Sequence, residues 1–225
     1  NQTAGFSIIT YTGTGAEGDV THGLGGKPDW IITKVRNGNG DEPWPVWHKS
    51  MVDADADNGA YIYLNTTGED QTTTVFYEGD AISSTVVAFK GGNANVNADG
   101  TNYVMYCFRS IQGYSKFSGY SGNGDTDGPF VYTGFKPAWL MIKRVDGAGY
   151  WVMLDNKRNT PNGTGKRLGS NASDAEYGST NVDILSNGFK VRASNSDSDT
   201  NLDGGSYIYM AFAEHPFVSS KGVPV

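Results

Sequence analysis

The sequence contains one cysteine, Cys107, and three histidines that stand apart, His22, His48 and His215. A single cysteine cannot form an internal disulfide, and isolated histidines without companion cysteines do not make a zinc site. Cys107 lies in the apolar run Tyr103–Phe108, which predicts a buried, structural thiol.

Catalytic motifs are also missing. The nucleophile elbow, the phosphate-binding glycine loop and the dinucleotide fingerprint do not occur in a strand–turn–helix context. We therefore expect no enzyme activity. A glycosidase pair of carboxylates stays open as an alternative, because Asp and Glu together number 24.

Charge is scarce as well. Charged residues make up 18% of the chain, against about 25% in average proteins, and the net charge is −7 without any basic run. Phosphate binding needs clustered Lys and Arg, so nucleic acid is not an expected partner. The sequence has no run of 18 apolar residues, so we do not expect it to insert into a membrane.

Glycine is abundant instead, at 31 of 225 residues, roughly twice its usual share of about 7%. Short runs of aromatic and β-branched residues alternate with turns rich in Gly, Asn, Asp and Ser, and no helical period persists for three turns. This pattern predicts an all-β chain of many short strands, as in β-sandwiches.

The strongest signal is an internal repeat. The proline-led run Lys27–Lys34 matches Lys136–Lys143, and three further pairs follow in order: Tyr11–Gly15 with Tyr120–Gly124, Asn97–Val104 with Asn201–Ile208, and Phe108 with Phe212. We predict a tandem duplicated antiparallel β-sandwich of jelly-roll or lectin-like type. The first repeat covers 5–113, the second covers 114–217, and 218–225 form a C-terminal tail.

Each proline-led run predicts the central strand of its repeat. Trp30 and Trp139 occupy matching positions, and apolar residues stand on both faces of each run. We therefore expect both tryptophans to be buried.

Two acidic segments are candidate calcium sites. Asp53, Asp55 and Asp57 alternate as at the start of an EF-hand loop, but the glycine falls one place late and no helices flank the segment. Asp197 and Asp199 precede an Asp-Gly turn. A solvated acidic turn and ordinary turn chemistry are the alternatives at the two places.

Five segments resemble a domain of unknown function that recurs in tail-fibre-like and other structural proteins of tailed phages, especially marine ones. These segments are Gly5–Gly13, His22–Ile32, Gly113–Phe117, Asp127–Trp139 and Tyr209–Phe217. In such proteins the domain usually follows other sequence, and the chain begins at Asn1 without an initiator methionine, so we expect it to be a piece of a longer protein.

The resemblance implies a virion-surface protein, extracellular, with other virion proteins as partners and a homotrimer or other multimer as its assembly. We expect a tail-fibre or receptor-binding module that recognises host surface glycans. A purely structural or capsid-decorating virion protein is the first alternative, and a bacterial extracellular carbohydrate-binding module is the second.

For the glycan we expect an aromatic surface beside polar loops. Trp44 and Trp47 are the best candidates for exposed aromatic side chains, because prolines flank them and the second repeat has no equivalent of Trp44. Asn39 and Asp41 in the adjacent loop would bind the sugar hydroxyls, and calcium at Asp53, Asp55 and Asp57 would order the rim.

Overall fold

The structure is a computed structural model that describes residues 1–38, 42–51, 59–72, 77–78, 81–158, 165–178 and 182–216. Every regular element in these ranges is a β-strand, and every strand pair is antiparallel. The prediction of an all-β chain is confirmed. Within the same ranges no helix has the length and apolar character needed to cross a membrane.

The chain divides into two compact units. The first comprises Asn1–Thr66 and Asp70–Arg109, and the second comprises Thr67–Glu69 and Ser110–Val225. The boundary near Arg109 lies close to the seam that the repeat indicates.

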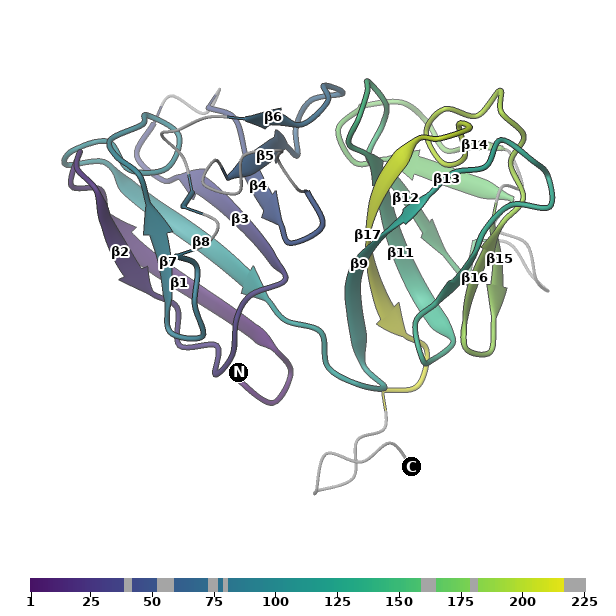
Figure 1. The fold of residues 1–225 in the computed structure, drawn as a ribbon, viewed down its shortest axis with the longest axis horizontal. Helices are drawn as coiled ribbons and strands as arrows, with labels where there is room; N and C mark the ends of the chain where they lie inside the picture. Colours follow the sequence, from purple (N-terminus) through teal and green to yellow (C-terminus); the bar gives the residue numbers. More distant parts are fainter. Residues whose placement is uncertain are drawn as a thin grey trace. The chain divides into compact units, whose positions relative to one another are not determined.

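In the first unit a six-stranded sheet faces a pair of strands (Figure 1). The large sheet has the order β1 (Phe6–Thr12), β8 (Asn102–Phe108), β3 (Trp30–Val35), β4 (Pro45–His48), β5 (Ala60–Tyr63) and β6 (Gln71–Thr72). The pair consists of β2 (Gly18–Thr21) and β7 (Val86–Phe89).

The second unit has the same plan. Its large sheet has the order β9 (Ser115–Ser121), β17 (Ser206–Ala213), β11 (Pro137–Arg144), β12 (Val152–Asp155), β13 (Lys166–Gly169) and β14 (Tyr177–Gly178). Its small sheet has the order β10 (Phe130–Tyr132), β16 (Gly188–Val191) and β15 (Val182–Leu185). Taken in chain order, the strands of the two large sheets therefore occupy the same places.

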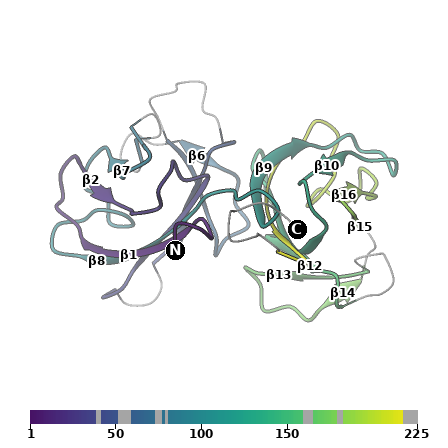
Figure 2. The same ribbon diagram turned by 90° about the horizontal axis from the view of Figure 1, so that it is seen from below.

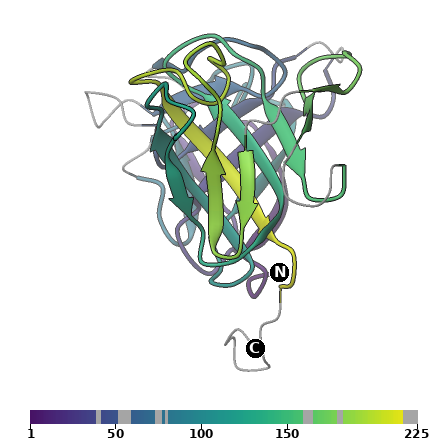
Figure 3. The same ribbon diagram turned by 90° about the vertical axis from the view of Figure 1, so that its right-hand side faces the viewer.

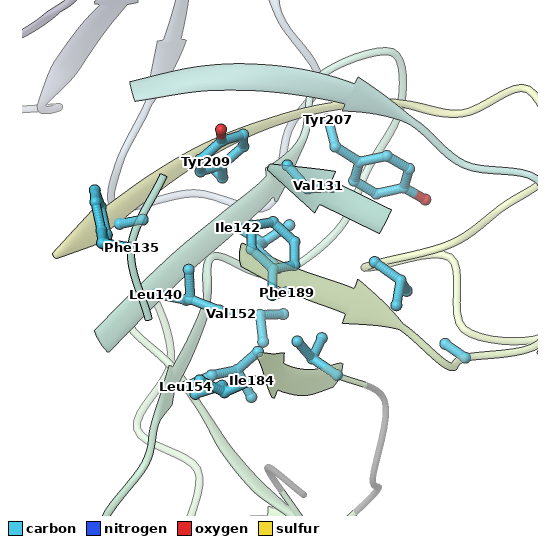
Figure 4. Close-up of a cluster of buried hydrophobic side chains, with 14 of the residues drawn as sticks. Val131, Phe135, Leu140, Ile142, Val152, Leu154, Ile184, Phe189, Tyr207 and Tyr209 are labelled. Carbon is cyan, nitrogen blue, oxygen red and sulfur yellow. The ribbon is translucent and has the colours of Figure 1, made fainter. Parts of the chain in front are cut away.

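The core of the second unit lies between its two sheets. Leu140 and Ile142 of β11 point toward Phe189 of β16, and all three are fully buried (Figure 4). Figure 2 shows β10, β16 and β15 as the wall of this unit opposite β12 and β13. Alternate residues of each strand enter the core, which is the packing of a β-sandwich.

The matched tryptophans have the same register but different burial. Trp30 is opposite Phe108, and Trp139 is opposite Phe212. Trp30 is 0% exposed and its ring meets His48 edge-on at 5.0 Å. Trp139 is only half-buried, so the prediction for it was wrong. Its neighbour on β12 is Asp155 in place of His48, and a charged neighbour has to stay near water.

Candidate functional site

Two aromatic side chains of β10 face the solvent. Phe130 is 47% exposed and Tyr132 is 64% exposed, and the only other large hydrophobic side chain with comparable exposure in the described ranges is Ile8, at 57%. Val131 lies between them and is buried in the core. Because successive side chains point to opposite faces of a strand, burial of Val131 directs both rings outward.

The neighbouring strands extend this outer face in two rows. Phe130 is opposite Lys190 of β16, which is opposite Asp183 of β15. Tyr132 is opposite Gly188. The row between them, which contains Val131, enters the core. In Figure 3 the small sheet, with β15 and β16 in yellow-green, lies in front of the large sheet of the same unit.

Gly188 keeps the space beside the rings free of a side chain. A Cβ atom at this position would lie 2.1 Å from the carbonyl oxygen of Val131 and 3.1 Å from Cε2 of Phe130. The first distance is a clash with the backbone that no side-chain movement could relieve. Glycine is therefore required here, and the ring of Phe130 lies over it.

Charged side chains form the rim of this face. Lys190 Nζ lies 2.8 Å from Asp127 Oδ1 and donates a hydrogen bond to the carbonyl of Gly128 at 2.9 Å. Arg192 Nε donates to Asp183 Oδ2 at 2.8 Å. The hydrogen bond from Lys190 holds the pKa of the Asp127 carboxyl below its ordinary value, so this group is ionised at neutral pH. We call the surface of Phe130, Tyr132, Asp127, Asp183, Lys190 and Arg192 the β10 face.

The first unit lacks the aromatic pair. There β2 takes the place of β10, and the spacing of 109 residues that relates Lys27–Lys34 to Lys136–Lys143 matches His22 to Val131, both of which are buried. Thr21 and Gly23 flank His22 where Phe130 and Tyr132 flank Val131. The repeated fold therefore does not require aromatic residues on this outer face.

The profile of a domain of unknown function, DUF7483, matches residues 1–216. The chain belongs to the DUF7483 family. No curated protein and no solved structure matches it. Because the profile covers both units, the family is defined by the pair and not by one repeat.

In this DUF7483 domain Trp44 and Trp47 do not form an exposed aromatic surface. Trp47 is 5% exposed and belongs to the core of the first unit, so the prediction of an exposed Trp47 was wrong. Its partner across the ladder is Ile31, which faces the same core. Trp44 is half-buried, and Lys34 Nζ lies 5.4 Å from the centre of its ring. Asn39 and Asp41 lie outside the described residues.

The predicted calcium ligands Asp197 and Asp199 both bind Arg167. Arg167 Nη1 donates to Asp197 Oδ1 at 3.1 Å and to Oδ2 at 2.8 Å, while Nη2 lies 3.5 Å from Asp199 Oδ2. The guanidinium also lies over Tyr177, at 4.8 Å from the ring centre. Arg167 thus takes the place that a cation would occupy between the carboxylates.

The remaining calcium candidates, Asp53, Asp55 and Asp57, lie outside the described residues. Within the part of the chain that the structure describes, no three or more His, Cys, Asp or Glu side chains gather as a metal site would require.

Sequence reasoning missed Phe130 and Tyr132 as site residues. The signal was the triplet Phe-Val-Tyr, in which a core valine would direct both aromatic rings to the solvent. The opposite assignment, with the rings inside, was equally consistent with the sequence. Only the pairing of β10 with β16 decides which face is buried.

Proposed function

We propose that this DUF7483 domain is a tail-fibre-type recognition module on a phage virion, and that it binds host surface glycans through the β10 face. The observation that carries the proposal is the exposed pair Phe130 and Tyr132 on a strand whose other face is fixed in the core. The resemblance to tail-fibre-like proteins supports the virion setting. The tandem jelly-roll or lectin-like arrangement belongs to the same proposal, supported by the equal strand order of the two large sheets.

The chemistry of the face suits a sugar. A pyranose packs its C–H surface on an aromatic ring, and carboxylates beside the ring accept hydrogen bonds from its hydroxyls. Phe130 and Tyr132 provide the rings, and Asp127 and Asp183 provide the acceptors. The site lies on rigid strands, so binding costs little conformational entropy.

Such a shallow face binds weakly, with a dissociation constant of roughly millimolar to micromolar order. Assembly into a homotrimer with other virion proteins would multiply the effective affinity by roughly 10²–10⁴. Asp127 and Asp183 each hold a cation, so neither is placed as a free catalytic acid or base, and the proposed role is binding without catalysis.

An exposed aromatic pair also fits a second role. Aromatic side chains are enriched in protein interfaces, so the same residues would serve a structural or capsid-decorating protein that docks on a neighbour in the virion. A bacterial extracellular carbohydrate-binding module is the third candidate, and it would share the sugar site.

The test is a screen of bacterial surface polysaccharides on an array, with the domain multimerised on streptavidin. We expect binding that Phe130→Ala or Tyr132→Ala reduces at least about tenfold, since each removes a stacking surface. The matched control is Thr21→Ala, at the position of the first unit that corresponds to Phe130. Exposed substitutions of this kind change stability by about 0.5 kcal/mol or less, so thermal melting should be unchanged. Absence of any binding, or binding that both aromatic variants retain, would favour the structural role.

A further inference from the structure

We infer that the ligand of the β10 face is a neutral sugar and not an acidic one, an inference that rests on the proposed function. Each charged side chain around Phe130 and Tyr132 has a partner of opposite charge.

The two cations of the face are already bound by protein groups. Lys190 Nζ contacts the Asp127 carboxylate and the Gly128 carbonyl, at 2.8 Å and 2.9 Å. Arg192 binds Asp183 through Nε at 2.8 Å, and its Nη1 lies 3.6 Å from Asp127. Recognition of a sugar carboxylate or phosphate uses an Arg or Lys that offers free N–H donors, preferably in bidentate geometry.

An acidic sugar would have to displace one of these carboxylates or share Arg192 with both of them, because Arg192 Nε binds Asp183 and its Nη1 lies 3.6 Å from Asp127. The exposed ion pairs are individually weak, so the displacement itself is affordable. The displaced carboxylate would nevertheless stay beside the ligand's own negative charge, and like charges at this separation repel. The chain's net charge of −7 adds to the unfavourable field for a polyanion.

A neutral sugar meets the opposite situation. An ionised carboxylate only accepts hydrogen bonds, and sugar hydroxyls are donors. The Asp127 side chain is 81% exposed, and Lys190 fixes one of its oxygens while lowering the pKa of the carboxyl. Tyr132, which is 64% exposed, offers a ring on which the C–H surface of the sugar packs.

The experiment compares matched neutral and acidic probes on one array: lactose with sialyllactose, and methyl-esterified polygalacturonate with the free polygalacturonate. We expect binding among the neutral members, lost in Tyr132→Ala. Asp127→Asn removes an acceptor and releases Lys190, so we expect it to weaken neutral binding about tenfold, the effect of one hydrogen bond to a charged group, and to strengthen acidic binding.

Asp99→Asn is the matched control, because it changes the net charge equally at an exposed residue of the first unit. Binding of acidic probes that depends on Tyr132 would overturn this inference and leave the proposed function standing. Binding of no probe, or binding that is independent of Tyr132, would overturn the proposed function and this inference with it. Thermal melting of each variant establishes that a loss of binding is not a loss of fold.

Discussion

Asn97 and Asn201 make the same hydrogen bonds at the same place in the two units. Asn97 Oδ1 accepts from the Thr14 amide at 3.0 Å, and its Nδ2 donates to the carbonyls of Ala16 and Gly91 at 2.7 and 3.2 Å. Asn201 Oδ1 accepts from the Asn123 amide at 3.0 Å, and its Nδ2 donates to the carbonyls of Asp125 and Ala193 at 2.8 and 2.6 Å. Each asparagine ties three segments of loop together from a buried position.

Replacing either asparagine with alanine should destabilise the protein. Asn201→Ala leaves one amide and two carbonyls without their partner, and a buried unsatisfied group costs about 1–3 kcal/mol. Water that enters the space replaces part of the lost hydrogen bonding. We therefore expect the free energy of unfolding, measured by urea titration, to fall by about 2–4 kcal/mol, and by the same amount for Asn97→Ala. Asn102→Ala is the control, since that side chain is exposed, and it should cost less than about 1 kcal/mol. Equal stabilities of Asn102→Ala and Asn97→Ala would contradict the role of the buried amide.

The tryptophans should differ in their contribution to stability. Trp30 is fully buried, so Trp30→Ala should cost about 3–5 kcal/mol. Trp139 is half-buried and tilted against Phe212 at 5.9 Å, so Trp139→Ala should cost less than about 2 kcal/mol. Guanidinium titration followed by circular dichroism measures both. Losses of the same size would show that the two positions are equivalent in packing as well as in register.

The sequence predicted those features that the repeated pattern imposes. The strand character of the proline-led runs, the burial of Trp30 and the burial of Cys107 all follow from apolar residues at strand spacing, and the structure confirms them. Burial raises the pKa of the Cys107 thiol to about 12, as suits a structural residue.

What the sequence could not predict depends on pairing between distant segments. Trp44 and Trp47 looked alike beside their prolines, but alternation on β4 directs Trp47 into the core. In the sequence Asp197 resembles a metal ligand, but in the structure its carboxylate binds Arg167 of β13. The outward direction of Phe130 and Tyr132 likewise required the register of β10 with β16.

His48 should make the protein less stable in acid. Burial lowers the pKa of its folded-state imidazole to about 3, assisted by Lys49, while nearby Asp29 acts in the opposite direction. The unfolded chain binds a proton near pH 6.5, so between pH 6.5 and about 3 the unfolded state carries the extra proton. Stability is therefore fully present above pH 6.5, and this group removes up to about 1.4 kcal/mol per pH unit as the pH falls toward 3.

The measurement is the free energy of unfolding from urea titrations between pH 4 and pH 7. His48→Asn should flatten this dependence, because an asparagine carbonyl can accept the Ser50 amide hydrogen bond that His48 Nδ1 accepts at 3.0 Å. The matched control is the same substitution at an exposed histidine, His215→Asn. A slope that His48→Asn does not change would assign the acid sensitivity to other groups.

Arg167 is the cation between Asp197 and Asp199. The side chains of Arg167 and both aspartates are only 11–13% exposed, so Arg167→Met leaves two carboxylates close together without their counter-charge. Burial already raises the pKa of Asp199, which shows that its charge is poorly solvated. Removing one partner of such a buried pair costs about 3 kcal/mol, although the methionine retains contact with Tyr177. The double variant Arg167→Met with Asp197→Asn should recover part of the loss, since it removes one of the two facing charges.

Calcium should not raise the melting temperature of the wild-type domain by binding Asp197 and Asp199, because the Arg167 guanidinium already holds both carboxylates. A calcium-dependent rise in Tm that Asp197→Asn abolishes would show instead that the two aspartates bind a metal, which displaces Arg167.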